Sequence, residues 1–158
     1  MVSPGAEAEL VAAFERGPRR LARAVSGLPR ALLGRRPAPQ AWSVQEVLAH
    51  LADNAVVAAW RMRLVLAQDD PPLTPYDQDA WAWPYQHASA QESLATLRLL
   101  RRTAAGLLRR APASAWQKAG FHPEQGRRTL RDLVQGQIDH LDEHVGQIAE
   151  IKRKIRSP

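Results

Sequence analysis

Two histidines, His140 and His144, are the residues in this sequence best placed to do chemistry. Their segment is predicted to be helical, and residues four apart on a helix lie one above the other on the same face. A helix holds such a pair rigidly enough for two imidazoles to bind a single transition metal. The same spacing also arises by chance between solvated histidines, so the pair alone leaves both interpretations open.

A third histidine, His50, lies in a second amphipathic segment. At roughly 100° per residue it falls on the flank of that segment's apolar stripe, alongside Asn54 and Arg61. A single histidine in such a position is commonly structural or solvated. Its meaning therefore depends on whether the fold brings it to the histidine pair.

The composition is that of a globular chain, and it limits the available chemistry. The 158 residues are enough for one domain, which we expect to span residues 1–158. Cysteine is absent, which excludes disulfides, thiolate ligands and a cysteine nucleophile, so nitrogen and oxygen must hold any metal. No apolar run approaches the roughly 20 residues that span a membrane, and no secretory signal is visible. We therefore expect a cytoplasmic protein without membrane contact.

The formal net charge is +6, and most of the basic residues are arginines. A basic chain can bind nucleic acid, but these arginines are spread over several segments without interleaved aromatic residues. We interpret them mainly as solvated helix faces and regard a nucleic-acid groove as the weaker interpretation. A general attraction for anionic ligands follows from the charge.

Four helices are predicted from apolar periodicity and from local start signals. A serine or threonine followed three residues later by an acidic residue has the spacing of a capping box. The start signals are Ser3-Pro4, Ser43 with Glu46, Ser89 with Glu92, and Thr129 with Asp132. The helices are expected at about 4–28, 43–68, 89–110 and 129–153.

Two breaks qualify this pattern. Gly17-Pro18 predicts a kink or a break within the first helix, because proline removes a helical hydrogen bond. Residues 113–128 are interpreted as a loop or short turn. Since no strand-like alternation competes anywhere, the fold class is predicted to be all-α, a four-helix bundle.

A long segment, residues 69–88, separates the second and third helices and is rich in aromatic residues. Connections in helical bundles commonly take about 2–8 residues, so this one is unusual. It could be a surface loop pinned to the bundle by its aromatic side chains. It could also be a lid or wall over a pocket, or a dimer contact. These interpretations are compatible, and the sequence leaves them open.

Several motifs together resemble the DinB superfamily of helical bundles, within it the YfiT-like group assigned as metal-dependent hydrolases and bacillithiol transferases. The similarity covers roughly residues 38–152. It is specific because the order and spacing of the histidines occur together with an aromatic loop motif. The motifs are Trp42-Ser43, His50-Leu51-Ala52-Asp53, Arg61, Pro75-Tyr76-Asp77, Ala80-Trp81, Phe121-His122-Pro123, and His140 with His144.

The resemblance implies a four-helix bundle, often dimeric, with one divalent metal such as nickel or zinc held by three histidines. Carried over by position, the ligands are His50, His140 and His144. The group is associated with conjugation of a low-molecular-weight thiol to electrophiles. Asn54 departs from the resemblance, because relatives often carry another polar residue there, and this puts the substrate contacts in question.

The first functional hypothesis is therefore a metal-dependent thiol S-transferase that uses a bacillithiol-like thiol. Three imidazoles leave coordination positions open for substrate, as in a catalytic site. Arg61 is a candidate for binding an anionic group of the thiol, or else forms an ion pair on the surface. His122 is a candidate for substrate contact near the metal, although its place in a loop favours exposure. Asp139 points about 100° away from His140 and more naturally faces solvent.

Two alternatives compete with this hypothesis. The same metal could activate water and hydrolyse an amide or ester, but that reaction needs a base. Glu46, Glu143 and Asp53 lie near ligands in sequence, and Glu46 is better explained as a capping residue. The alternative of another class is a non-enzymatic, stress-related or nucleic-acid-binding bundle, for which salt-dependent DNA affinity would be diagnostic.

Overall fold

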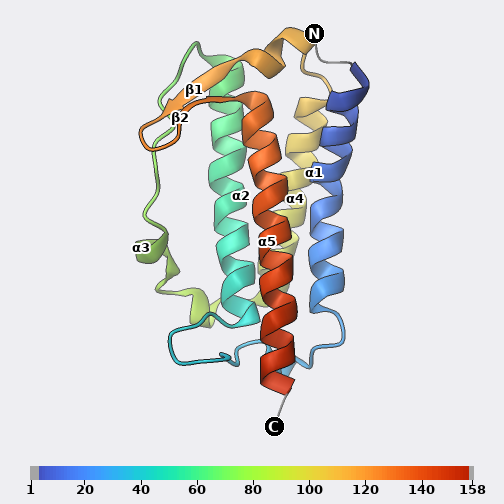
Figure 1. Ribbon diagram of the computed structural model, residues 1–158, viewed down its shortest axis with the longest axis vertical. Coiled ribbons are helices and arrows are strands. Elements are labelled where there is room, and N and C mark those ends of the chain that lie inside the picture. Colours follow the sequence, from blue (N-terminus) through green and yellow to red (C-terminus); the bar gives the residue numbers. More distant parts are fainter. Residues whose placement is uncertain (1–3, 157–158) are drawn as a thin grey trace.

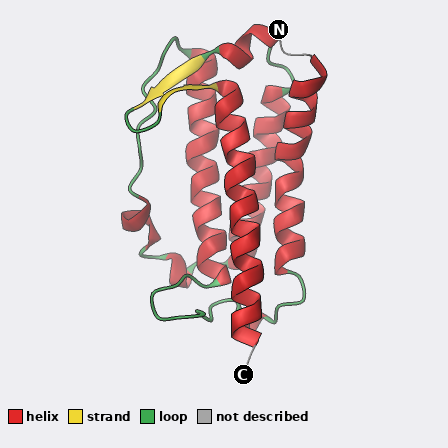
Figure 2. Ribbon diagram, in the orientation of Figure 1, coloured by secondary structure: helices red, strands yellow, loops and turns green. Residues whose placement is uncertain are grey.

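The computed structural model describes residues 4–156, and four long helices form its body (Figures 1 and 2). α2 packs against α4 and α5, and α1 packs against α5 and α4, so each helix has two neighbours. The predicted all-α four-helix bundle is confirmed. The expected cap at Ser3 lies outside the described residues. The helices are α1 Pro4–Val25, α2 Val44–Ala67, α4 Ala90–Leu108 and α5 Leu130–Arg156.

The helix directions explain the long segment between α2 and α4. In Figure 1, α1 and α5 run away from the hairpin end, whereas α2 and α4 both run toward it. Because α2 and α4 are parallel, residues 69–88 must return along the whole bundle before α4 can begin. α2 has 24 residues, which corresponds to about 36 Å of helix. This crossover segment contains α3, Gln78–Ala82, and a 3₁₀ turn, η2, Tyr85–His87.

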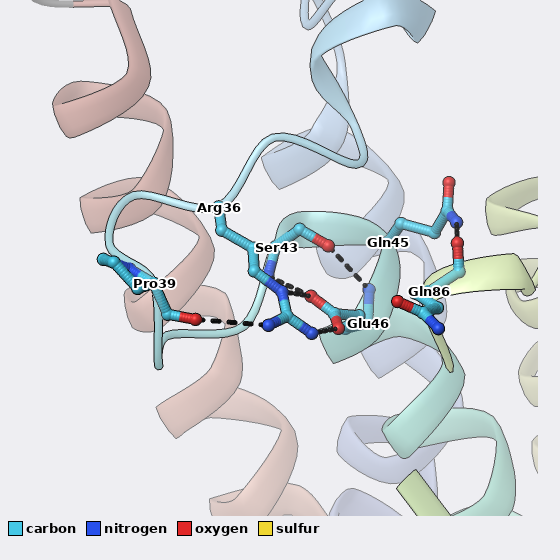
Figure 3. A network of polar contacts seen from close by, with 6 residues as sticks. All are labelled: Arg36, Pro39, Ser43, Gln45, Glu46 and Gln86. Atoms are coloured by element: carbon cyan, nitrogen blue, oxygen red, sulfur yellow. Dashed lines mark hydrogen bonds and ion pairs between the residues drawn. The ribbon is translucent and has the colours of Figure 1, made fainter. Parts of the chain in front are cut away.

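The start of α2 is fixed by a complete capping box (Figure 3). Ser43 Oγ accepts from the backbone N–H of Glu46 at 3.3 Å, and Glu46 Oε2 accepts from the backbone N–H of Ser43 at 2.8 Å. Arg36 forms an ion pair with the same carboxylate and donates to the carbonyl of Pro39 at 3.2 Å. A short 3₁₀ turn, η1, Arg30–Leu32, precedes this network. The sequence prediction of the capping box is confirmed.

The sequence predicted a kink or a break at Gly17-Pro18. α1 continues through both residues, so there is no break. Pro18 has no N–H to donate to the carbonyl of Phe14, four residues before it. The buried guanidinium of Arg101 supplies this donor instead, with Nη1 at 3.2 Å from that oxygen. Gly17 leaves the space, because a Cβ there would come within 3.1 Å of the same Nη1. α1 nevertheless ends at Val25, earlier than expected.

The segment before α5 was also predicted incorrectly, because it contains strands. After a 3₁₀ turn, η3, Ala113–Gln117, strands β1 (Ala119–His122) and β2 (Gly126–Thr129) form an antiparallel hairpin. Four-residue strands carry too little alternation to be detected in the sequence. The backbone around Pro72 pairs with Phe121, so the crossover segment is attached to β1.

The core consists of two apolar clusters that follow each other along the bundle. One lies near the hairpin and includes Met62, Val65 and Leu130. The other lies toward the opposite end and includes Leu51 and Leu141. None of the helices within residues 4–156 combines the length and apolar composition that crossing a bilayer requires.

Candidate metal centre

Three imidazoles from two helices converge on one point. His50 projects from α2, and His140 and His144 project from α5. The Nε2 atom of His140 lies 3.1 Å from Nε2 of His50 and 3.1 Å from Nε2 of His144. The ligand nitrogens of all three residues lie within 4.8 Å of one another. A tetrahedral ion with metal–nitrogen bonds of about 2.0–2.1 Å separates its ligands by about 3.3 Å, so the spacing fits a single ion.

His50 is buried, whereas the sequence predicted a position on the flank of the apolar stripe of α2. The residue is only 1% exposed, because α5 lies against its side of α2. Its ring packs edge-on against both partner imidazoles, with centroids 5.1 Å from His140 and 4.9 Å from His144. Trp42 covers it from the start of α2 at a centroid distance of 5.1 Å. His50 is therefore fixed by packing before any ligand arrives.

The electrostatic surroundings keep the rings of His50 and His140 neutral. Burial, together with the neighbouring His140 and His144, lowers the pKa of His50 to about 3. Burial, the neighbouring His144 and the charge of Arg101 lower the pKa of His140 to about 4. Metal binding needs an unprotonated imidazole nitrogen. The donor set thus fits a divalent ion that accepts nitrogen ligands, such as zinc or nickel.

A glutamine on α5 orients one of the rings. His144 Nδ1 lies 2.6 Å from Oε1 of Gln147, one turn further along the helix. Because the amide oxygen only accepts, Nδ1 carries the proton and Nε2 keeps its lone pair for a metal. The Nδ1 atoms of His50 and His140 are buried, and the described residues provide no hydrogen-bond partner for them.

A row of polar side chains continues from the histidines toward the hairpin. Gln137 Nε2 on α5 donates to Oδ1 of Asn54 on α2 at 2.8 Å. Asn54 Nδ2 lies 3.4 Å from the hydroxyl oxygen of Tyr76 in the crossover segment. Tyr76 packs against Trp81 with centroids 5.0 Å apart. The crossover segment is thus pinned to α2 through Tyr76, beside Asn54, which lies one helix turn from His50.

Arg61 and His122 lie further along this row. Arg61 Nη2 donates to the carbonyl of Thr74 at 2.6 Å, and no ion pair within the described chain involves it. The expected surface ion pair is therefore absent from that part of the chain. His122, expected to be exposed in a loop, is buried at 5% exposure in β1. Since α2 contacts β1, the two candidates are brought to the same end of the bundle.

The carboxylates considered as bases for hydrolysis are engaged elsewhere or exposed. Asp53 accepts a hydrogen bond from the hydroxyl of Tyr85 at 3.0 Å, and Glu46 belongs to the capping box. Glu143 is exposed, and Asp139 is an exposed acceptor for Gln135 at 2.8 Å. Among residues 4–156, no carboxylate joins the group of three histidines.

Comparison with known proteins identifies the family of this helical bundle. The family model of the DinB superfamily matches residues 13–148. The chain belongs to the DinB superfamily. It is 29% identical to "Putative metal-dependent hydrolase YfiT" of Bacillus subtilis over 117 residues. This match covers 72% of this chain and 66% of that protein. Over 115 residues it is 30% identical to a protein of the same description from Oceanobacillus iheyensis, covering 72% of this chain and 67% of that one.

Solved structures of DinB-like bundles agree with this assignment. The YfiT structure from Bacillus subtilis, described as having an unusual four-helix bundle topology, superimposes with a TM-score of 0.89 at 26% identity, covering 98% of this chain and 90% of that one. A mycothiol-dependent maleylpyruvate isomerase shares the fold, with a TM-score of 0.74 at 13% identity, covering 90% of this chain and 60% of that one. The predicted family is confirmed. The matched part is about two thirds of the length of the curated relatives.

Sequence reasoning missed several side chains of this DinB-type site. Gln147 and Gln137 were not identified, although each lies three residues from a histidine on the same helix. That spacing places them on the histidine face and could have revealed them. Trp42 was noted only as part of the family motif, and Arg101 was not identified; both reach the site from other elements. No local pattern indicates such contacts, because they depend on tertiary packing.

Proposed function

We propose that His50, His140 and His144 hold one divalent metal ion and that the protein is a metal-dependent enzyme. The convergence of three imidazole nitrogens within 4.8 Å supports this proposal most directly. A bound divalent ion would supply a Lewis acid that stabilises a thiolate or lowers the pKa of water. Three protein ligands leave room for such a substrate.

The reaction we favour is transfer of a low-molecular-weight thiol to an electrophile. The thiol loses its proton, its sulfur forms a bond to an electrophilic carbon, and the leaving group of that carbon departs. The absence of cysteine means that the sulfur must come from a co-substrate. No carboxylate accompanies the three histidines in the described chain, which suits thiol chemistry because the lowered thiol pKa itself makes the nucleophile.

The chain's own residues would then bind and orient the reactants. Gln147 fixes the ring of His144 so that Nε2 faces the other two histidines. Trp42 limits access of water to one side of His50, and Tyr76 of the crossover segment closes against Asn54, one helix turn further along α2. The Asn54–Gln137 pair offers amide groups one helix turn from the ligands for contact with a substrate.

The test is a conjugation assay on protein purified without a polyhistidine tag. Bacillithiol or a similar thiol is mixed with monochlorobimane, and product fluorescence is followed with and without a chelator. We expect conjugation that a chelator removes and that added zinc or nickel restores. Conjugation that is unaffected by both the chelator and replacement of His140 would refute the transferase proposal.

Hydrolysis of an amide or ester is the second candidate, and the descriptions of the curated relatives favour it. It would use the same three histidines. Chelator-sensitive turnover of ester or amide substrates, without thiol conjugation, would select hydrolysis over transfer. The homodimer and the cytoplasmic location stay predictions that sedimentation and fractionation can test.

A further inference from the structure

Arg61 is a cation without a carboxylate partner at the hairpin end of the polar row. Its one hydrogen bond in the described chain is from Nη2 to the carbonyl of Thr74. Its Nε atom is buried and has no hydrogen-bond partner among residues 4–156. Leaving a guanidinium partly desolvated and without a counter-charge costs free energy, which an anion would recover.

His122 adds a neutral donor beside this cation. The backbone N–H of Glu124 donates to Nδ1 of His122 at 3.2 Å, so the proton of the neutral ring lies on Nε2. Burial, the charge of Arg61 and the charge of Arg128 lower the pKa of His122, and Glu124 only partly opposes them. No hydrogen bond in the described chain occupies Nε2, which therefore remains available to donate.

Arg61 faces the same side of α2 as the metal ligand. His50 and Arg61 are separated by 11 residues, which at about 100° per residue is three full turns plus about 20°. The rise is about 16 Å, and the side chain of Arg61 leans back toward the helix start, where His50 lies. Asn54 and Tyr76 fill the row between them, and Tyr76 acts electrostatically on Arg61.

We propose that Arg61 and Nε2 of His122 form a binding subsite for a carboxylate or phosphate carried by an elongated substrate, whose other end reaches the three histidines. The proposal rests on the proposed function, because the histidines define where the reacting end lies. It assigns a substrate class, namely an extended molecule with an acidic group about 10–16 Å from its reacting atom. The acidic group belongs either to the thiol or to the electrophile, and the binding experiments below distinguish these two possibilities.

The first test measures binding rather than activity. Cobalt(II)-loaded protein is titrated with glutathione, an extended acidic thiol, and with its diethyl ester, and thiolate-to-cobalt absorption gives both affinities. We expect the acid to bind about tenfold more tightly than the ester, which is the effect of one charged hydrogen bond. Arg61→Met should remove this preference by weakening only the acid, and Arg61→Lys should restore part of it. Arg63→Met is the matched control, because Arg63 is exposed and donates to the carbonyl of Ala59 on its own helix.

The outcomes separate the alternatives. A preference lost in Arg61→Met assigns the acidic group to the thiol. Equal weakening of acid and ester by Arg61→Met would show that Arg61 only anchors Thr74 and would overturn the thiol assignment. If the acid has no advantage, the same comparison is made with 10-bromodecanoate, an elongated acidic electrophile with a bromide leaving group, and its methyl ester, scored as protection of cobalt from chelation. Absence of a preference in both arms overturns the subsite.

A second measurement does not depend on the metal or on thiol chemistry. The side-chain Nε–H signals of nitrogen-15-labelled metal-free protein are followed as inorganic phosphate is added. We expect the Arg61 signal, identified by its loss in Arg61→Met, to shift at millimolar phosphate while the Arg63 signal stays in place. Equal shifts of both signals, or none, would overturn the subsite. If no thiol gives cobalt absorption, the transferase proposal fails, and this measurement still decides the subsite.

Discussion

Arg101 donates a hydrogen bond to the main-chain oxygen of Phe14, the oxygen that Pro18 leaves without its helical donor. The other end of the same guanidinium donates to the carbonyl of Gln137 at 2.6 Å, three residues before His140. The buried side chain of Arg101, which projects from α4, therefore replaces the donor that α1 lacks. It also joins α1 to the segment of α5 that carries the proposed metal ligands. Its guanidinium also lies 4.4 Å from the ring centroid of Phe14.

Replacement of Arg101 tests this relationship. We expect Arg101→Met to lower the free energy of unfolding by about 2 kcal/mol, because the carbonyl oxygen of Phe14 loses its donor and that of Gln137 loses the bond it accepts besides its helical one. Pro18→Ala should stabilise the Arg101→Met variant by about 1 kcal/mol more than it stabilises the wild type, because alanine restores the missing N–H. Urea denaturation of the four proteins gives this coupling. Additive effects of the two substitutions would contradict the account.

Gly120 allows the crossover segment to approach β1. A Cβ at this position would lie 2.6 Å from the carbonyl oxygen of Pro71 and 2.8 Å from Cγ of Leu73, so the backbone would have to move. We expect Gly120→Ala to lower the free energy of unfolding by about 1–3 kcal/mol, as overpacking does. Gly146 on α5 has nothing within 4 Å of its added Cβ. Gly146→Ala should therefore stabilise the protein by about 0.5–1 kcal/mol, and equal signs for the two variants would count against this contact.

Glu46 gives the fold a dependence on acid pH. Burial alone would raise its pKa, but hydrogen bonds from Arg36 and Ser43 outweigh burial and hold the pKa below the ordinary value of 4.5. Its stabilising contribution is therefore complete above that ordinary value and is lost as the pH falls through the lowered pKa. The wild type should lose more unfolding free energy on acidification than Glu46→Gln does. Parallel pH profiles for the two proteins would exclude this role.

Gln147 is expected to tune metal affinity without being a ligand. Loss of such an outer contact typically weakens metal binding about 10–100-fold, because the histidine ring is no longer held in the right tautomer and orientation. Competition with a chromophoric chelator would measure this loss in Gln147→Ala. Gln135→Ala is the matched control, since exposed Gln135 donates its side-chain hydrogen bond to exposed Asp139 on the same helix. A loss of the same size in both variants would refute the specific role of Gln147.

The helices and their starts could be predicted because their causes are local. The reciprocal bonds of Ser43 with Glu46, and of Thr129 with Asp132, join residues three positions apart. The break expected at Pro18 failed for the opposite reason. Its compensation comes from Arg101, which no local rule connects with Phe14. The hairpin was missed because its short strands depend on pairing with the backbone around Pro72.

The candidate site likewise combines features that local sequence patterns predict with features that depend on tertiary packing. The spacing of His140 and His144 indicated that they share one face of a helix, and the family resemblance indicated His50 as the third ligand. The burial of His50 and His122 was not expected: α5 covers His50, and the hairpin places His122 beside α2. The parallel arrangement of α2 and α4, which makes the crossover segment necessary, could not be read from any one segment (Figure 1). It is a property of how the helices pack.

The most direct test of the central claim is the ratio of metal to protein in tag-free material. Mass spectrometry of the wild type after exposure to zinc or nickel and desalting should give about one divalent ion per chain. The folded variant with His50, His140 and His144 all replaced by alanine should retain essentially none. Metal-free wild-type protein after such exposure, or an unchanged metal content in the triple variant, would contradict the account.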